Sequence, residues 1–300
     1  MSPNNARRYK VDHYTAYRYS EPVMLSHQQL HLAPRQLDYQ AIHAHEVVVK
    51  PAPTQRRQLT DPFGNPVTEI AIEAAHRSLD IIARSTVSVT ERPTIEAAQT
   101  PAWETVRDAL AYRAAWQPPA ALLEATQFLF ESPYARVKRI LRAYAENCFA
   151  PGQPVLSAAV ALMAKIHGEF KFDAGATNVT TPVMKFFEQK RGVCQDFTHL
   201  MISCLRSTGL AARYVSGYLL THPAPGKPRR VGADASHAWV ALFIPGEGWV
   251  DLDPTNNLRP ALEHVTVSWG RDFSDVTPLR GVINGGGEQT LEVKVTVEPI

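Results

Sequence analysis

The sequence predicts an α+β protein, with a β-sandwich-like N-terminal region over residues 1–95 and a mixed region of helices and strands over residues 96–300. Short runs rich in β-branched residues, separated by turn sequences, occupy residues 7–92. Helical periodicity begins after them, and an apolar hairpin pattern follows near residue 240. A chain of 300 residues can bury a substantial core, in one large domain or two ordinary ones.

Composition and charge exclude several classes of protein. The chain has 31 basic and 29 acidic side chains, so its net charge of +2 points to no nucleic-acid or membrane partner. No apolar run reaches the roughly 18 residues of a membrane-spanning helix, and the first residues lack the apolar core of a signal peptide. Three cysteines, a sparse and odd count, argue against a disulfide framework and suit a reducing compartment. We therefore expect a cytoplasmic protein.

The N-terminal region has the pattern of paired strands and tight turns. "YKVDHYTAYRYS", residues 9–20, alternates so that Tyr9 and Val11 share one face with the aromatic residues that follow. "DPFGNPV", residues 61–67, concentrates proline, glycine and asparagine as turns do. Strands at this spacing favour a small sandwich or barrel, and nothing in the region looks catalytic.

Two helices are predicted in the middle of the chain. "YARVKRILRAYAENC", residues 134–148, places apolar residues at helical spacing, which predicts a buried stripe. The stripe consists of Val137, Ile140, Leu141, Tyr144 and Cys148. Residues 155–170, "VLSAAVALMAKIHGEF", are apolar on most sides and predict a second, buried helix.

A third helix is predicted to begin at Cys194 and to end before Gly209. Cys204 lies in its apolar stripe and is expected in the core. Cys194 occupies the first turn, where unpaired backbone N–H groups and the helix dipole favour a thiolate. A small buried residue is the alternative for that position. Gln195 and Asp196 are expected to stabilise the helix start, and His199, on another side of the helix, to make a structural hydrogen bond.

A β-hairpin is predicted next. His237 precedes the apolar run 238–244, a glycine-rich turn follows at 246–248, and Asp253 ends the returning strand. A three-residue turn leaves His237 and Asp253 on one face, offset along the strands. A histidine oriented by a carboxylate is the arrangement that takes a proton from a nucleophile. Asp251 is a nearby competitor for the acidic role.

These segments together resemble a known family. "RGVCQDFTHLMISCLRSTGLAARYVSGY" followed by "SHAWVALFIPGEGWVDLDPTNN" is similar to the bacterial transglutaminase-like family, over a core at about residues 155–260. "YRYSEPVMLSHQQLHLAPRQ" and "DPFGNPV" resemble the β-rich region that often precedes such domains in bacteria. The resemblance implies a papain-like, transglutaminase-like α+β domain after the N-terminal β region.

The resemblance also implies site residues and a reaction. Cys194 would be the nucleophile, His237 the base and Asp253 the residue that orients His237, with the "DPT" context favouring Asp253 over Asp251. The implied reaction is attack on a peptide or protein amide through a thioester, with no metal or organic cofactor. Resolution by water gives a peptidase or amidase, and resolution by an amine gives a transglutaminase. Hydrolysis is favoured because no calcium-binding loop is evident. Ala241 departs from the family, where an acidic residue often follows "HAWV".

Two other functions remain open. A catalytically silent binding module would keep the fold and the motif without the reaction. A metal site built from Cys194, His237 and an aspartate would use suitable ligand types, although no short-spaced ligand pair exists. The proline-rich loop 221–236 is either a cover over the site or a surface connection. The substrate, the second oxyanion-hole donor and the oligomeric state do not follow from the residues.

Overall fold

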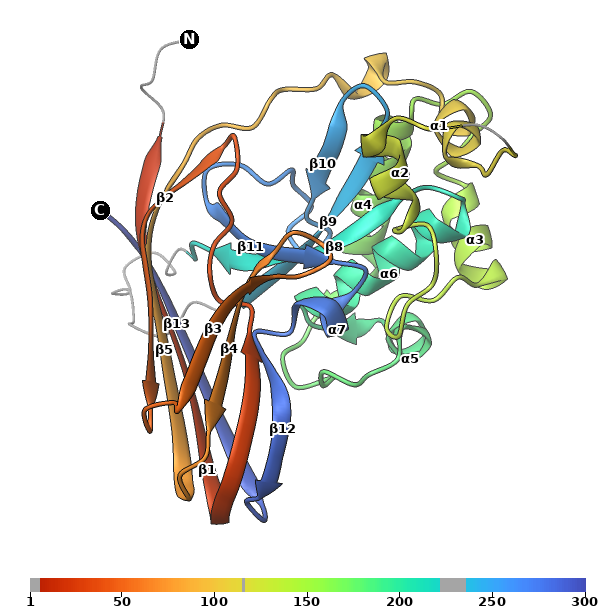
Figure 1. The fold of residues 1–300 in the computed structure, drawn as a ribbon. Helices are drawn as coiled ribbons and strands as arrows, with labels where there is room; N and C mark the ends of the chain where they lie inside the picture. Colours follow the sequence, from red (N-terminus) through yellow and green to blue (C-terminus); the bar gives the residue numbers. More distant parts are fainter. Residues whose placement is uncertain (1–5, 115–116, 222–235) are drawn as a thin grey trace, which may run out of the picture.

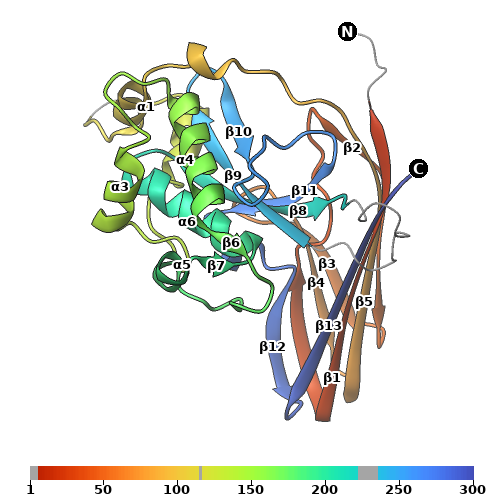
Figure 2. The same cartoon turned by 180° about the vertical axis from the view of Figure 1, so that it is seen from behind.

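The computed structural model describes residues 6–114, 117–221 and 236–300, and these residues are arranged in layers (Figure 1). Helices cover one face of a four-stranded sheet, and a long seven-stranded sheet lies on the other side of it. The view from behind has the same arrangement (Figure 2). The α+β class and the β-rich N-terminal region are thus confirmed. Within the described ranges, no helix is long and apolar enough to cross a membrane.

The first strand organises the large sheet. β1 has 24 residues and pairs with β5 along its first half and with β4 along its second half. Tyr9 and Val11, on one face of the predicted alternation, are buried. The strands of this region are β1 (Arg7–Leu30), β2 (Gln40–Lys50), β3 (Gln55–Thr60), β4 (Pro66–Ile72) and β5 (His76–Val89).

The last strands of the chain complete the same sheet. β12 (Leu279–Gly285) and β13 (Gln289–Pro299) both pair with β1 in antiparallel register, so the two ends of the chain share one sheet. Such pairing is non-local, and periodicity along the chain contains no signal for it. The N-terminal sheet thus includes strands from both sides of the predicted domain boundary between residues 95 and 96. That boundary stays a prediction.

The middle of the chain forms the helical layer. Its elements are η1 (Ala97–Gln99), α1 (Trp103–Leu110), α2 (Ala120–Thr126), α3 (Arg139–Glu146), α4 (Val155–Glu169), β6 (Lys171–Phe172), α5 (Val183–Gln189), β7 (Arg191–Gly192) and α6 (Cys194–Ser207). The predicted stripe of α3 is partly wrong, because Val137 and Ile140 are 40% and 52% exposed. Leu141 and Cys148 of the predicted stripe are buried, and Ala145 is buried with them. Val137 precedes α3, which begins at residue 139, and Ile140 lies on the exposed side of the helix.

The four-stranded sheet has the order β10-β9-β8-β11 and is fully antiparallel. Its strands are β8 (Ala212–Leu219), β9 (Ser236–Ile244), β10 (Gly248–Leu252) and β11 (His264–Gly270), and the short helix α7 (Phe273–Val276) follows. Helix α6 packs on β8 and β9, and its residues Gln195–Arg206 are buried on every side. A central helix held in this way gives its first residue a fixed position relative to the sheet.

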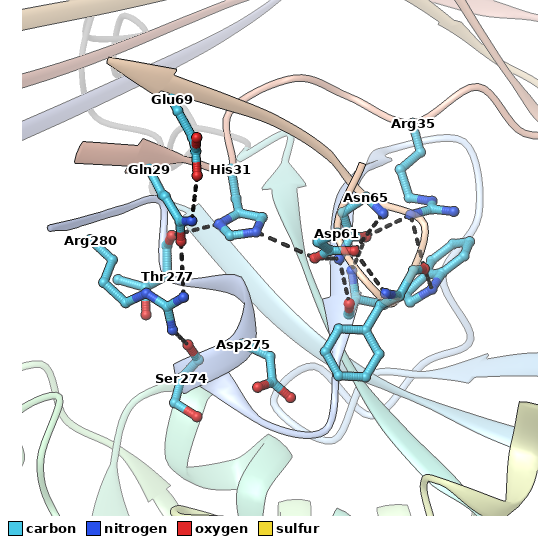
Figure 3. Close-up of polar contacts among 12 residues, drawn as sticks. Gln29, His31, Arg35, Asp61, Asn65, Glu69, Ser274, Asp275, Thr277 and Arg280 are labelled. Carbon is cyan, nitrogen blue, oxygen red and sulfur yellow. Dashed lines mark hydrogen bonds and ion pairs between the residues drawn. The ribbon is translucent and has the colours of Figure 1, made fainter. Parts of the chain in front are cut away.

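The turn at residues 61–67 fastens the N-terminal region to this sheet (Figure 3). Asn65 is fully buried, and its side-chain amide accepts from the Trp269 N–H at 3.0 Å and donates to the Trp269 carbonyl at 2.7 Å. Asp61 accepts the backbone N–H groups of Phe63 and Asn65, each at 2.8 Å, which holds the turn. The Arg35 guanidinium lies 3.5 Å from the Trp269 ring centroid. The predicted turn therefore also supports β11.

Candidate active site

Cys194 is the first residue of α6, as the sequence predicts. Val193 is extended before it, and the Asp196 carboxylate accepts the Val193 N–H at 2.8 Å and the Thr177 hydroxyl at 2.6 Å. Asp196 thus stabilises the helix start, as expected. The residue before Val193 must be a glycine, because a Cβ at Gly192 would lie 2.8 Å from the Phe186 ring. Together these contacts fix where the Cys194 backbone and thiol emerge.

The three cysteines differ in access. Cys148 and Cys204 are buried, and burial raises the pKa of both thiols. Cys194 is only partly buried. Since the thiolate is the nucleophile, a buried thiol with a raised pKa is inert at neutral pH. Cys194 is therefore the cysteine with the access and the position that thiol chemistry needs.

The hairpin brings His237 and Asp253 to one face. Gly248 pairs with Ile244, so three residues form the turn, one position earlier than expected. His237 is the second residue of β9, and Asp253 directly follows β10. The predicted offset is present, and His237 Nε2 lies 2.7 Å from Asp253 Oδ2. Because Nε2 contacts Asp253, Nδ1 is the ring nitrogen that can meet the thiol.

The electrostatics of this group favour a protonated histidine. Burial alone would lower the pKa of His237, but hydrogen bonds to Asp253 and to the Cys194 thiol raise it to about 10. Burial alone would raise the pKa of Asp253, but hydrogen bonds from His237, His264 and Asn256 hold it below its usual range. A carboxylate ionised at all physiological pH values can support an imidazolium. The arrangement therefore favours the imidazolium form of His237.

Asp253 is held by more groups than the hairpin alone supplies. Its side chain is fully buried, and Oδ1 accepts the backbone N–H groups of Thr255 at 3.0 Å and Asn256 at 3.2 Å. Oδ2 accepts the Asn256 amide at 2.7 Å and the His264 ring at 3.2 Å, besides His237. Sequence reasoning missed His264 and Asn256. Asn256 directly follows the "DPT" turn, so its closeness to Asp253 could have been predicted. His264 lies on β11, and spacing along the chain does not predict its contact with Asp253.

Asp251 has a different partner. Its carboxylate lies 3.1 Å from Arg92 Nε, and both side chains are largely buried. Arginine stays protonated in proteins, so the Arg92–Asp251 pair does not take part in proton transfer. The structure places Asp253, and not the competitor Asp251, beside His237.

His237, Asp253 and His264 also have the composition of a metal-binding set, with ligand atoms within 4.8 Å of one another. Two ligands at about 2.1 Å from a tetrahedral zinc ion are more than 3 Å apart. The separation of 2.7 Å between His237 and Asp253 is that of a direct hydrogen bond. The geometry is thus that of a hydrogen-bonded cluster. It does not include Cys194, which the metal alternative requires.

The other predicted residues have structural positions. His199 is buried, stacks on Tyr134 and accepts the Phe273 N–H at 3.2 Å, which is the structural hydrogen bond expected. The Gln195 amide donates to the Val179 carbonyl at 3.1 Å, so it anchors a loop and does not cap the helix. The possible cover at 221–236 lies, except for its two end residues, outside the described residues.

Comparison with known proteins is consistent with this geometry. Residues 9–88 match the bacterial transglutaminase-like N-terminal region, and residues 142–254 match the transglutaminase-like superfamily. An uncharacterized protein of Mycobacterium tuberculosis is 37% identical over 304 residues, which are 99% of this chain and 94% of that protein. A protein-glutamine gamma-glutamyltransferase of Pseudomonas aeruginosa is 35% identical over 75 residues, 25% of this chain but only 11% of that protein.

A solved structure shares the fold over nearly the whole chain. It is named "Putative Cysteine Protease from Cytophaga hutchinsonii", and it matches with a TM-score of 0.72 and 20% identity, over 98% of this chain and 91% of that one. The family matches and the long relative agree with the sequence motifs. The chain belongs to the transglutaminase-like superfamily, with the bacterial transglutaminase-like N-terminal region ahead of its core.

Proposed function

We propose that this protein is a cysteine hydrolase of peptide or amide bonds. One observation supports it above all: His237, whose pKa the Cys194 thiol and Asp253 both raise, lies with Nε2 2.7 Å from the buried carboxylate of Asp253. Cys194 itself is a partly buried thiol at a helix start. In this proposal Cys194 is the nucleophile, His237 the acid and base, and Asp253 the group that orients His237. The substrate is a peptide or protein amide, and the cytoplasm is the proposed compartment, consistent with three free thiols.

The reaction runs through a thioester. The Cys194 thiolate attacks the carbonyl carbon, and the electron pair of the C=O bond moves to oxygen. The first N–H groups of a helix have no intrahelical acceptor, so the Cys194 N–H can donate to this oxyanion. The oxyanion collapses, the C–N bond breaks, and His237 gives its proton to the leaving amine. Water then attacks the thioester with His237 as base, releasing the acid and restoring the thiolate–imidazolium pair.

Transfer to an amine is the second candidate. The short similarity to a protein-glutamine gamma-glutamyltransferase favours it, and an amine in place of water would give an amide product. Both reactions share the acyl-enzyme and differ only in the acceptor. Incubation with a glutamine-containing peptide and a fluorescent primary amine separates them. We expect release of ammonia with little amine incorporated.

The first test is the rate of Cys194 alkylation against pH, in the parent protein and in His237→Ala. We expect fast labelling well below the ordinary cysteine pKa of about 8.5, and its loss in the variant. Cys148 and Cys204, followed by mass spectrometry in the same sample, are internal controls that should stay slow. A slow Cys194 that is indifferent to His237 would overturn the proposal and favour the binding module.

A further inference from the structure

A second histidine contacts the same oxygen of Asp253 that His237 uses. His264 is the first residue of β11 and is 2% exposed, and its Nε2 lies 3.2 Å from Asp253 Oδ2. Because an ionised carboxylate only accepts hydrogen bonds, both histidines must present a proton to it from Nε2. Two rings from different strands thus converge on one buried oxygen.

The surroundings of His264 fix its tautomer. With the proton on Nε2, Nδ1 carries none, and Nδ1 is buried without a hydrogen-bond partner among the described residues. The His264 ring makes an edge-to-face contact with the Trp239 ring, with centroids 5.3 Å apart and planes at 86°. A second proton on Nδ1 would be a buried donor with nothing to accept it, which is costly. His264 is therefore a neutral donor.

We propose that His264 is a positioning residue for the reaction: as a neutral donor from β11 it holds the Asp253 carboxylate in line with His237 without neutralising its charge. This inference rests on the proposed function of Cys194, His237 and Asp253. A cationic group at this place would also hold the carboxylate, but it would compensate the charge that supports the His237 imidazolium. A neutral imidazole supplies the orientation and leaves the charge for His237.

The size of the effect is bounded by the other donors. Two backbone N–H groups still hold Oδ1, and the Asn256 amide still reaches Oδ2 at 2.7 Å. Loss of His264 should therefore loosen the carboxylate without releasing it. We expect a change of about tenfold, as for one hydrogen bond to a charged group, and not the loss that follows removal of Asp253.

The test compares Cys194 alkylation against pH in the parent, His264→Leu, His264→Asn and His264→Gln. The glutamine amide can reach Oδ2, whereas the asparagine amide is one bond too short. We expect leucine and asparagine to slow alkylation at pH 7 about tenfold and to move its acid limb to higher pH, and glutamine to recover most of the rate. If the leucine variant does not fold, the asparagine and glutamine pair decides.

Two further measurements separate the possible results. His13→Leu removes a histidine buried to the same extent but bonded to Tyr218, and it should leave the pH profile unchanged. In the parent, ¹⁵N NMR should report His264 as the neutral Nε2–H form from pH 5 to 9. A protonated ring or the Nδ1–H form would overturn the inference. If His237→Ala slows alkylation but the three His264 variants keep the parent profile, only the inference fails; if His237→Ala changes nothing, the proposed function fails with it.

Discussion

The site and the interior next to it contain the same three residue types with opposite properties. At the site, Cys194 is partly exposed, the pKa of His237 is raised to about 10, and Asp253 is bonded to His237. The interior counterparts are Cys204, His199 and Asp251. Cys204 and His199 lie further along α6, and Asp251 lies on β10. Burial raises the pKa of Cys204 and lowers that of His199, while Asp251 pairs with Arg92.

The comparison shows that the charged partner and the solvent exposure of a side chain, and not its residue type, determine its pKa and its contacts. Burial disfavours charge in both histidines, but only His237 has an ionised carboxylate bonded directly to its ring. The same carboxylate type beside an arginine makes a structural ion pair instead. Matched substitutions in the two regions can therefore break or sharpen the comparison.

The cysteine pair should give the largest contrast. With a peptide amide substrate, Cys194→Ala should lose turnover by on the order of 10⁴-fold or more, because no acyl-enzyme can form. Cys204→Ala should keep the turnover and instead lower the free energy of unfolding by about 1–2 kcal/mol through the cavity it leaves. Steady-state kinetics and urea titrations measure both. Equal loss of turnover in the two variants, with both folded, would contradict the comparison.

The aspartate pair should give the next contrast. Asp253→Asn should reduce turnover by on the order of 10²- to 10⁴-fold with the fold intact, because the amide cannot support an imidazolium. Asp251→Asn should keep turnover but lower the free energy of unfolding by about 3 kcal/mol, since it leaves Arg92 buried without its counter-charge. The reverse pattern would show that Asp251 is the acidic residue of the site.

The histidine pair should give the smallest contrast, as opposite dependences of stability on pH. The folded-state pKa of His237 lies above the value of about 6.5 of an unfolded chain, so its stabilisation is complete below that pH and is lost as the pH rises through about 10. The pKa of His199 is lowered, so His199 costs stability as the pH falls below about 6.5. Urea unfolding of the parent, His237→Gln and His199→Gln between pH 5 and 10 measures each contribution by difference. Parallel curves for all three proteins would contradict both signs.

Turnover should have an alkaline limb from the same group. In the proposed reaction His237 must be protonated to donate to the leaving amine, so the rate of acylation should fall as the pH rises through about 10. The acylation rate from single-turnover kinetics measures it, and Cys204→Ala serves as the control with an unchanged limb. A rate that still rises beyond pH 10 would exclude His237 as the acid.

The local features of the site were predictable from the sequence. Helix spacing and Gly209 place Cys194 in the first turn of α6, and an apolar run with a glycine-rich turn predicts the hairpin that carries His237. These signals are local, because a helix start and a hairpin depend on neighbouring residues. The predicted stripe was wrong at Val137, which precedes α3, and at Ile140, which lies on the exposed side of that helix.

By itself the sequence determined the family, the place of Cys194 at a helix start and the shared face of His237 with the end of β10. The "DPT" context favoured Asp253 over Asp251, and the tertiary structure placed Asp253 beside His237 and Asp251 beside Arg92, although periodicity cannot separate two residues on one face of a strand. The tertiary structure alone brought His264 to Asp253 and joined β12 and β13 to β1. The physical reason is that helix starts and hairpins depend on residues close in the sequence, whereas contacts between distant strands form only when the layers pack together.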